Sequence, residues 1–207
     1  MNHLKFFYGA ILASVLSVLF FSCVSVPVEQ GKIYPQCSRE ILGKGIKNDM
    51  ALADFFLSEN PDVPLGDIQR LARYYISECA AEGINSDAAF VQMCLETGFL
   101  RFGNLVVPEM HNYCGLGAMD AEHPGEKFET EQLGVRAHIQ HLQAYATTQD
   151  VKLNNQLIDP RYNWVHKTKL VTDIFGLTGT WATDPNYGNK IDEIISRMEV
   201  FIKNIKK

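Results

Sequence analysis

Apolar residues recur at three- and four-residue intervals in several long stretches of the chain, and this spacing is typical of amphipathic helices. Such stretches include residues 52–56, 68–79 and 191–205. Helical spacing is lost from Gly98 to about Thr130, where glycine and proline are frequent. We therefore predict a mainly α fold: a helical body with a small β or loop lobe inserted in its middle. A cleft between these two parts is the expected ligand site.

The inserted segment follows an apolar helical run that ends in a glutamate, "FVQMCLETGFLRFGN", residues 90–104. Gly98 is a typical helix end because glycine readily adopts the left-handed conformation. Glu96 is therefore expected in the last turn, where the negative end of the helix dipole disfavours an anion and raises the carboxyl pKa. Phe99 and Phe102 would exclude water and add to that shift. A carboxyl kept protonated in this way suits a general acid, whereas the alternative is a solvated glutamate that only ends a helix.

Composition excludes several classes of function. The chain has 207 residues, of which 46% are hydrophobic and 21% charged, as in an ordinary globular protein. Its formal net charge is −5 and it has no basic cluster, so nucleic acid is not an expected partner, because binding to phosphates depends on Lys and Arg. It has no phosphate-binding loop or dinucleotide motif, and no cofactor is expected.

The N-terminus has the pattern of an export signal. Lys5 precedes an uncharged stretch from Phe6 to Phe21. Ser22 and Cys23 follow, and a small residue before a cysteine at this place resembles the lipobox of bacterial lipoproteins, in which the cysteine is acylated. Simple cleavage, or retention as a membrane anchor up to Val28, are the alternatives. Each of the three places the folded part outside the cytoplasm.

We accordingly divide the chain into three parts. Residues 1–22 are assigned to a signal peptide, residues 23–40 to lipid attachment and a tether, and residues 41–207 to the folded domain. The tether contains prolines and a glycine and has no hydrophobic period. A lipid anchor in the membrane would localise an acidic protein that charge alone cannot hold near an anionic cell wall.

The remaining cysteines and the histidines allow several readings. In an oxidising compartment Cys37, Cys79, Cys94 and Cys114 could form two disulfides in any of three connectivities, or could be four small buried hydrophobic residues. His138 and His141 are three residues apart on a helix predicted from near Gly134, and His111 and His123 could be imagined to complete a metal site. No spacing supports such a site, so we expect surface or edge-of-core histidines and no metal. Arg136 is expected to form a structural salt bridge.

Four segments together resemble the glucosaminidases of glycoside hydrolase family 73, which have a lysozyme-like fold and cut peptidoglycan. They are "AAFVQMCLETGFLRFG", "VVPEMHNYCGLGAMD", "GVRAHIQHLQAYA" and "WATDPNYGNKI". With a helical lead-in, the resemblance extends from about residue 50 to about residue 200. It implies hydrolysis of the β-1,4 bond between N-acetylglucosamine and N-acetylmuramic acid in peptidoglycan strands. The family's catalytic glutamate falls on Glu96.

The resemblance also suggests other site residues. A carboxylate on the inserted lobe is the family's usual second group, and Glu129 matches best among the acidic residues that follow Glu96, namely Asp120, Glu122, Glu126, Glu129 and Glu131. Alternatively the substrate's 2-acetamido group, or a water held by Tyr187, takes that role, because Tyr187 occupies the position of the family's active-site tyrosine. Tyr113 and Trp181 are candidates to stack on sugar rings, with core packing as the alternative. Asn112 is a candidate for the acetamido group, although it is first of all a turn residue.

Two other functions stay open. A lytic transglycosylase also uses a single glutamate followed by a small residue and glycine. A wall-binding lipoprotein could have kept the cleft and lost turnover.

Overall fold

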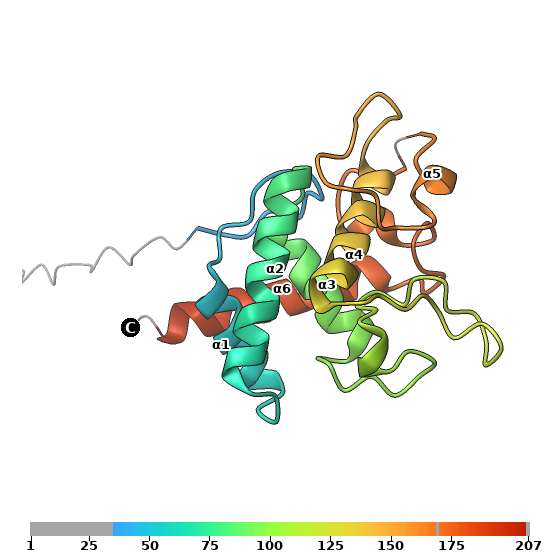
Figure 1. Ribbon diagram of the computed structural model, residues 1–207. Helices are drawn as coiled ribbons and strands as arrows, with labels where there is room; N and C mark the ends of the chain where they lie inside the picture. Colours follow the sequence, from blue (N-terminus) through green and yellow to red (C-terminus); the bar gives the residue numbers. More distant parts are fainter. Residues whose placement is uncertain (1–34, 169, 206–207) are drawn as a thin grey trace, which may run out of the picture. The chain divides into compact units, whose positions relative to one another are not determined.

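The computed structural model describes residues 35–168 and 170–205. The proposed signal peptide and the lipidation site at Cys23 lie outside the described residues. Within them the chain is mainly helical, and Figure 1 labels the α-helices. The elements are α1 (Asp49–Glu59), α2 (Leu65–Glu82), α3 (Ser86–Thr97), the 3-10 helix η1 (Pro108–Met110), α4 (Glu131–Ala146), α5 (Tyr162–Val165), the 3-10 helix η2 (Phe175–Leu177) and α6 (Tyr187–Ile205).

Helix α3 is the most deeply buried helix, and it packs against α1, α2 and α6. It begins where the sequence predicts, because the Asn85 side chain caps it by accepting a hydrogen bond from the Asp87 N–H at 3.1 Å. The Asn85 amide also donates to the carbonyls of Ser38 and Glu40, both at 3.0 Å. The start of α3 is thereby fixed to the N-terminal segment of the described chain.

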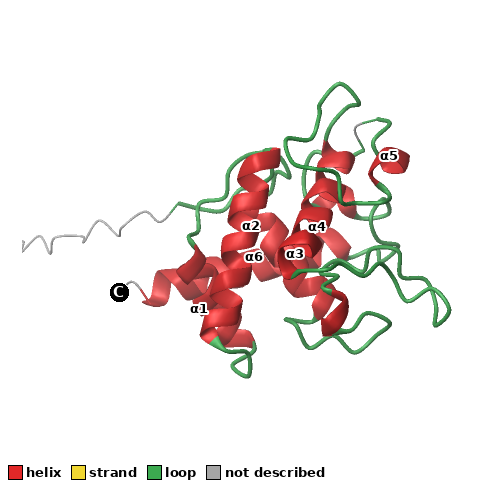
Figure 2. Cartoon of the chain, in the orientation of Figure 1, coloured by secondary structure: helices red, strands yellow, loops and turns green. Residues whose placement is uncertain are grey.

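The segment between α3 and α4 is loop in Figure 2. Among its described residues it contains η1 but no strand, so the lobe is irregular rather than β. A tight turn is held by hydrogen bonds from Glu126 N–H to Leu116 O at 2.8 Å and from Met119 N–H to His123 O at 2.9 Å. The prediction of a mainly helical body with an inserted lobe is confirmed, and the loop alternative for the lobe holds.

The folded domain begins earlier than the boundary at residue 41 that the sequence suggested. Cys37 is buried, and its N–H donates to the Glu199 side chain at 2.5 Å. Arg39 pairs with Asp192 at 2.7 Å and with Glu199 at 3.0 Å on α6. Residues from Cys37 onward therefore belong to the folded domain, because charged partners far along the chain hold them in place. That pairing is not visible in the local composition of the proposed tether.

The cysteines follow the second of the two readings left open by the sequence. Cys37, Cys79, Cys94 and Cys114 are free thiols and all four are buried. Burial also raises the pKa of the last three well above the usual value, so their thiols are inert small core groups.

A buried ion pair joins α2 to α4, as expected for Arg136. Arg136 Nε donates to Glu78 Oε2 at 2.9 Å, and only 3% of the Glu78 side chain is exposed. Gln132 and Asn155 also donate to the same carboxylate, at 2.7 and 2.9 Å. Both oxygens of the buried Glu78 carboxylate are therefore hydrogen-bonded, which is the condition for tolerating a buried charge.

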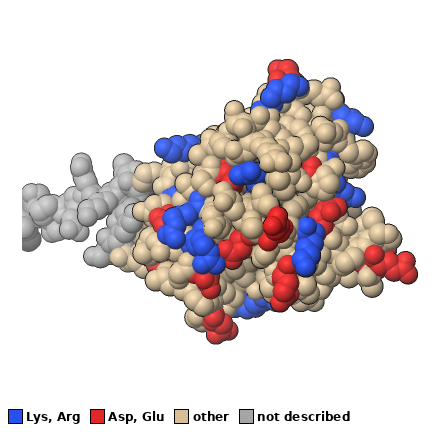
Figure 3. Space-filling model, in the orientation of Figure 1, with Lys and Arg blue, Asp and Glu red and all other residues tan. Residues whose placement is uncertain are grey.

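The described surface and helices add two observations. On the face shown in Figure 3, Lys and Arg side chains are interspersed with Asp and Glu rather than gathered into one basic patch. No helix among residues 35–168 and 170–205 is both long and apolar enough to cross a membrane.

Candidate active site

Glu96 lies in the last turn of α3, as predicted. Gly98 ends the helix in the left-handed conformation, with φ of 58°, and its N–H donates to Leu95 O at 3.3 Å. Phe99 and Leu100 also have positive φ, 56° and 59°, which is uncommon for residues with a side chain. This left-handed turn directs the chain away from the helix axis immediately after Glu96.

The aromatic residues after Glu96 do not act as the sequence suggested. Phe99 is 8% exposed and packs against Phe55 and Phe56 of α1, at ring-centroid distances of 6.1 and 5.6 Å. Phe102 likewise packs against the hydrophobic core. The prediction that these two rings cover Glu96 is not supported, because the left-handed turn directs Phe99 back onto α1.

Two residues from the C-terminal part of the chain surround Glu96 instead. Trp181 Nε1 donates to Glu96 Oε1 at 2.9 Å, and the Tyr187 hydroxyl donates to the same oxygen. Burial raises the pKa of Glu96 above its ordinary value, while the hydrogen bonds from Tyr187 and Trp181 act in the opposite direction. The carboxyl is therefore shifted in the direction that a general acid needs, with desolvation as the cause.

The two oxygens of Glu96 have different roles. Trp181 can only donate, and it occupies Oε1 together with Tyr187. Oε2 receives no hydrogen bond from the described residues, and it faces Gly115, whose ideal Cβ position lies 3.9 Å away. Because Oε1 is committed as an acceptor, Oε2 is the oxygen available to carry a proton, on the side of the loop that contains Gly115.

The position of Tyr187 depends on a close backbone approach at the start of α6. An ideal Cβ on Gly188 would lie 2.6 Å from Phe175 Cα and 2.8 Å from Ile174 O. Only glycine lets the first turn of α6 come so near to η2. Tyr187 is 5% exposed, and burial raises its pKa well above the usual value, so its hydroxyl stays a neutral donor.

Trp181 lies in the loop before α6 and is partly buried. Its ring packs against His141, Tyr145 and His138, with centroids 5.0, 5.2 and 5.8 Å away. Those three residues lie on α4. The sequence selected Trp181 for stacking on sugar; the structure gives it a direct bond to Glu96, which the motif did not indicate.

Sequence reasoning missed the polar side chains behind Tyr187. Gln92 Nε2 donates to the Tyr187 hydroxyl at 2.9 Å, and Gln92 Oε1 lies 3.1 Å from His138 Nε2. His138 Nδ1 lies 2.9 Å from the hydroxyl of Tyr75 on α2. His138 is fully buried, so the expectation of a surface or edge-of-core residue is wrong. The available signal was Gln92 itself, a polar residue one helical turn before Glu96 in an apolar helix.

Asn112 and Tyr113 are less available than predicted. Asn112 is 1% exposed; its amide donates to Leu116 O at 2.9 Å and to Glu126 O at 3.0 Å, and its carbonyl accepts from Leu116 N–H at 2.9 Å. It is thus the organiser of a turn, and the prediction of a substrate amide contact is not supported. Tyr113 is 5% exposed and belongs to the core cluster, which supports the core-packing alternative over sugar stacking.

The acidic residues of the inserted lobe lie in distinct environments. Glu129 is exposed and has no hydrogen bond or ion pair among the described residues, so nothing in the structure brings it to Glu96. Glu131 is paired with Arg70 at 2.8 Å. Glu126 is partly buried, and its Cγ and Oε1 lie 3.2 Å from the ideal Cβ position of Gly117, two residues from Gly115. Glu126 is therefore the lobe carboxylate whose side chain lies against the loop that faces Glu96.

The other histidines do not join the site as ligands. His141 Nδ1 lies 2.7 Å from Asp159 Oδ2, and both residues are buried. His123 is exposed and bonds to Asp120. Within the described part of the chain, no group of three or more His, Cys, Asp and Glu side chains is arranged to hold a metal ion.

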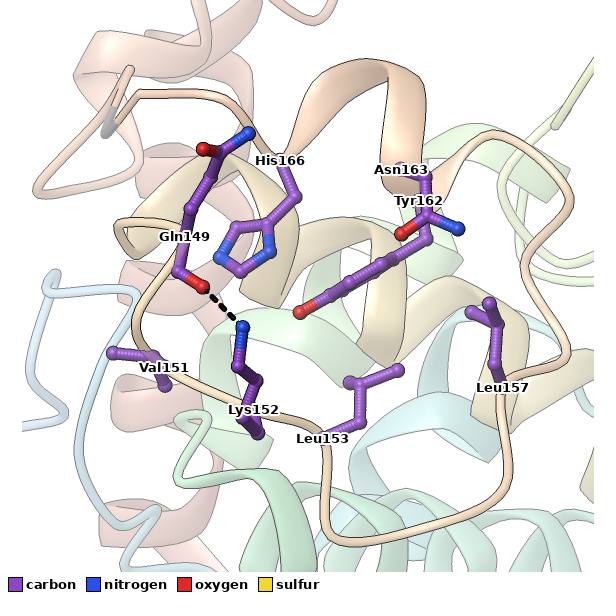
Figure 4. A pocket seen from close by; sticks show the side chains of 8 residues that line it. All are labelled: Gln149, Val151, Lys152, Leu153, Leu157, Tyr162, Asn163 and His166. Atoms are coloured by element: carbon purple, nitrogen blue, oxygen red, sulfur yellow. Dashed lines mark hydrogen bonds between the residues drawn. The ribbon is translucent and has the colours of Figure 1, made fainter.

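Two cavities lie away from Glu96. One, of about 290 Å³, is lined by eight residues of α5 and the loops beside it, including Lys152, Tyr162 and His166 (Figure 4). The other, of about 880 Å³, lies between residues 43–49 and the C-terminal half of α2. Neither includes Glu96, Trp181 or Tyr187, so the chemistry assigned to Glu96 does not involve them.

A mainly helical domain with one desolvated glutamate at a helix end, held by a tyrosine and a tryptophan, has the features of a glycosidase site, in which a carboxyl with a raised pKa lies beside the substrate. Comparison with known proteins narrows this class. Residues 72–200 match the glucosaminidase family model, described as mannosyl-glycoprotein endo-beta-N-acetylglucosaminidase. The chain therefore belongs to the glucosaminidase family, and its helical fold agrees with the lysozyme-like helical body that the sequence predicted.

A relative is similar to most of the chain. The chain is 36% identical over 172 residues to an uncharacterized protein of Borreliella burgdorferi, covering 83% of this chain and 81% of the relative. No solved structure matches the chain. The family supports glycoside hydrolase activity on a peptidoglycan-type substrate.

Proposed function

We propose that the protein hydrolyses the β-1,4 bond between N-acetylglucosamine and N-acetylmuramic acid within peptidoglycan strands, with Glu96 as the general acid. The observation that carries this proposal is the asymmetric environment of the Glu96 carboxyl. One oxygen accepts from Trp181 and Tyr187, while the other faces the inserted loop and is free to carry a proton.

The proton transfer follows from this geometry. Glu96 Oε2 donates its proton to the glycosidic oxygen as the bond to the anomeric carbon breaks. The carboxylate left behind is stabilised by the two donors on Oε1, which are already in place and need no reorganisation. Water then adds to the anomeric carbon, and its proton is taken up by a base on the other side of the site or by Glu96 itself.

For the group that assists on the far side of the sugar ring, Glu126 is a better candidate than Glu129. Glu126 contacts Gly117 in the loop that also presents Gly115 to Glu96, whereas Glu129 is exposed and unpaired among the described residues. Glu126→Gln is expected to lower hydrolysis strongly and Glu129→Gln to leave it near the parent value. The reverse result would restore Glu129 as the candidate.

A lytic transglycosylase is the second candidate. It is favoured by one observation: among the described residues Glu96 is held by Trp181 and Tyr187, while no hydrogen bond or ion pair fixes a second carboxylate at the site, and transglycosylases need only one. The presence of Tyr187 in the family's terminal motif supports hydrolysis instead. Mass analysis of the fragments separates the two, because hydrolysis leaves a reducing N-acetylglucosamine end, while 1,6-anhydromuramic ends would identify a transglycosylase.

The test of the proposal is digestion of purified sacculi by the folded domain and by Glu96→Gln. The variant is expected to stay folded, with one cooperative thermal transition, to keep glycan binding and to lose lysis in a zymogram. If Glu96→Gln digests sacculi as fast as the parent, Glu96 is not the acid. If the parent binds sacculi and shows no turnover, the domain is a non-catalytic wall-binding protein.

We also propose that the protein is an extracytoplasmic lipoprotein tethered through Cys23. The support is the N-terminal sequence pattern alone. Metabolic labelling with a radioactive fatty acid should mark the parent and leave Cys23→Ser unlabelled. Labelling of both proteins alike would refute the assignment.

A further inference from the structure

We propose that Gln92, His138 and Tyr75 are positioning residues for the reaction: they hold the Tyr187 hydroxyl as a donor to Glu96 and thereby set the pH at which Glu96 loses its proton. Together with Tyr187 and Glu96 they form a single line of hydrogen bonds from α2 to the end of α3, called the buried chain below. The inference rests on the proposed role of Glu96.

The direction of every bond in the buried chain follows from its two ends. Tyr187 has one hydroxyl hydrogen and accepts from Gln92 Nε2, so that hydrogen is directed to Glu96 Oε1. With its nitrogen facing Tyr187, Gln92 presents Oε1 to His138 Nε2 at 3.1 Å. His138 Nε2 must therefore carry a hydrogen.

His138 is neutral, and its neutral state fixes the direction of the hydrogen bond to Tyr75. It is fully buried, and burial lowers its pKa to about 3, with a smaller effect from His141. A neutral imidazole with hydrogen on Nε2 has a bare Nδ1, and the Tyr75 hydroxyl at 2.9 Å donates to it. All donors thus point toward Glu96, and such a line of bonds strengthens each member cooperatively.

Burial keeps the hydrogen bonds of the buried chain in this arrangement. Tyr75 and His138 are 0% exposed and Gln92 is 2% exposed. Water cannot replace a lost partner at these positions, so each polar atom depends on its neighbour. No buried side-chain N or O atom of the described residues lacks a hydrogen-bond partner. Every polar side-chain atom of the buried chain therefore has a partner. The end of the buried chain farthest from Glu96 is Tyr75, which lies in the core between α2 and α4.

Other titratable groups face Glu96 from the elements packed against it. Tyr187 comes from α6 and Cys114 from the inserted lobe, whereas His138 on α4 contacts Gln92 and not Glu96 itself. Burial raises the pKa of Tyr187 and of Cys114 well above their usual values, so both stay neutral between pH 4 and about pH 9. The His141–Asp159 pair contacts Trp181 through the His141 ring, and it is common to the parent and all variants below.

A second hydrogen-bond network elsewhere in the protein serves as an internal control. Gln143 on α4 is 1% exposed and accepts from the Tyr162 hydroxyl at 2.6 Å. Thr147 Oγ1 bonds to Gln143 and to His166 Nε2, the latter at 2.9 Å. This second network also joins a glutamine, a tyrosine and a histidine, its glutamine is as deeply buried as Gln92, and none of its hydrogen bonds reaches Glu96. Gln143→Leu therefore matches Gln92→Leu in the polar group lost and the volume kept.

The experiment compares pH profiles of kcat on soluble glycan fragments, with thermal unfolding of each variant measured alongside. Only protonated Glu96 is active, so kcat falls as pH rises through its pKa. Removing Gln92 weakens the Tyr187 donor, disfavours the carboxylate and moves this falling limb to higher pH. We expect an upward shift of roughly half to one pH unit and a roughly tenfold lower kcat for Gln92→Leu and His138→Leu.

Conservative variants separate positioning from packing. In His138→Gln the amide offers one donor to Gln92 and one acceptor to Tyr75, so the limb is expected to return to the parent position. Tyr75→Phe keeps the ring and removes only the hydroxyl that bonds to His138. We expect it to move the falling limb to higher pH by less than Gln92→Leu does. If Gln92→Leu does not fold, Tyr75→Phe tests the inference in its place. Gln143→Leu should lower the unfolding temperature and leave the limb unmoved.

Two results would overturn the inference. One is a pH profile of folded Gln92→Leu or Tyr75→Phe that superimposes on that of the parent, because the buried chain would then contribute to packing only. The other is an equal shift in Gln143→Leu. The activity of Glu96→Gln is measured first. If this variant is fully active, the proposed function is refuted. If it is inactive and the pH profiles of the other variants keep the falling limb of the parent, only the role of the buried chain is refuted.

Discussion

Replacing Trp181 by phenylalanine isolates one hydrogen bond to the proposed catalytic acid. Phenylalanine keeps an aromatic ring against His141 and Tyr145 and removes the indole N–H that lies 2.9 Å from Glu96 Oε1. The Tyr187 hydroxyl still donates to that oxygen. The variant therefore weakens the stabilisation of the Glu96 carboxylate and leaves the desolvation of the carboxyl in place.

The size of the effect follows from the bond and its burial. A hydrogen bond to a charged group contributes about 1.5–3 kcal/mol, and one pKa unit corresponds to about 1.4 kcal/mol. Because Glu96 is partly buried and keeps one donor, we take the lower end of this range. The pKa of Glu96 in Trp181→Phe should then rise by about one unit relative to the parent. The smaller ring costs about 1–2 kcal/mol of stability through lost packing.

The assay is the pH dependence of kcat, supported by an NMR titration of the Glu96 side-chain carboxyl. The falling limb of the profile is expected to move to higher pH by about one unit, because the protonated form persists further. The maximal rate should fall, since the acid is less rigidly held. Trp164→Phe is the matched control, because Trp164 is 71% exposed on α5 and has no bond to the site.

A limb that stays in place, or that moves to lower pH, would refute the reasoning. The first result would mean that the indole N–H does not stabilise the carboxylate. The second would mean that the smaller ring admits water and that desolvation, not hydrogen bonding, dominates the response. A carboxyl that is fully deprotonated near pH 4 in the parent would remove the basis of the proposed acid itself.

Three further predictions concern stability and placement. Arg136→Met leaves Glu78 as a buried carboxylate without its cation, so the free energy of unfolding should fall by about 3 kcal/mol in denaturant titration; an unchanged midpoint would contradict this. Gly188→Ala forces the start of α6 away from η2, so the unfolding temperature should fall and lysis should be lost through displacement of Tyr187; parent-like activity would show that the close approach is dispensable. Glu96→Gln should raise the unfolding temperature relative to the parent at pH 7 and not at pH 4. Burial raises the pKa of Glu96 in the folded state, so its ionisation costs stability as pH rises above the unfolded value of about 4.3. An unfolding temperature equal to that of the parent at both pH values would refute a desolvated carboxyl.

The features that the sequence predicts well depend on neighbouring residues. The cap at Asn85 and the helix end at Gly98 lie within a few residues of the groups they affect, and both are confirmed. Together they place Glu96 in the last turn of α3. The helical spacing of α6 likewise appears in the apolar positions that are buried. Local rules of capping and periodicity are sufficient for these conclusions.

The partners of Glu96 could not be derived in the same way. Trp181 and Tyr187 are 85 and 91 residues away in sequence, and His138 is 46 residues from Gln92. Periodicity gives the buried face of a helix but not the element that covers it. The family motif selected Tyr187 and Trp181 without their bonds. It was silent on His138, because a buried neutral histidine and a surface one have the same spacing.

The opposition between desolvation and hydrogen bonding at Glu96 connects activity to the packing of the core. Burial of the carboxyl raises its pKa, and the donors Tyr187 and Trp181 lower it, so the pH range of activity depends on the balance of two opposed effects. Tyr187 is held through Gln92 and His138 by a hydroxyl on α2. A substitution that loosens the packing of α2 against α4 therefore changes the donor before it unfolds the protein. For such substitutions, far from the site, a shift of the pH profile should precede the loss of the folded state.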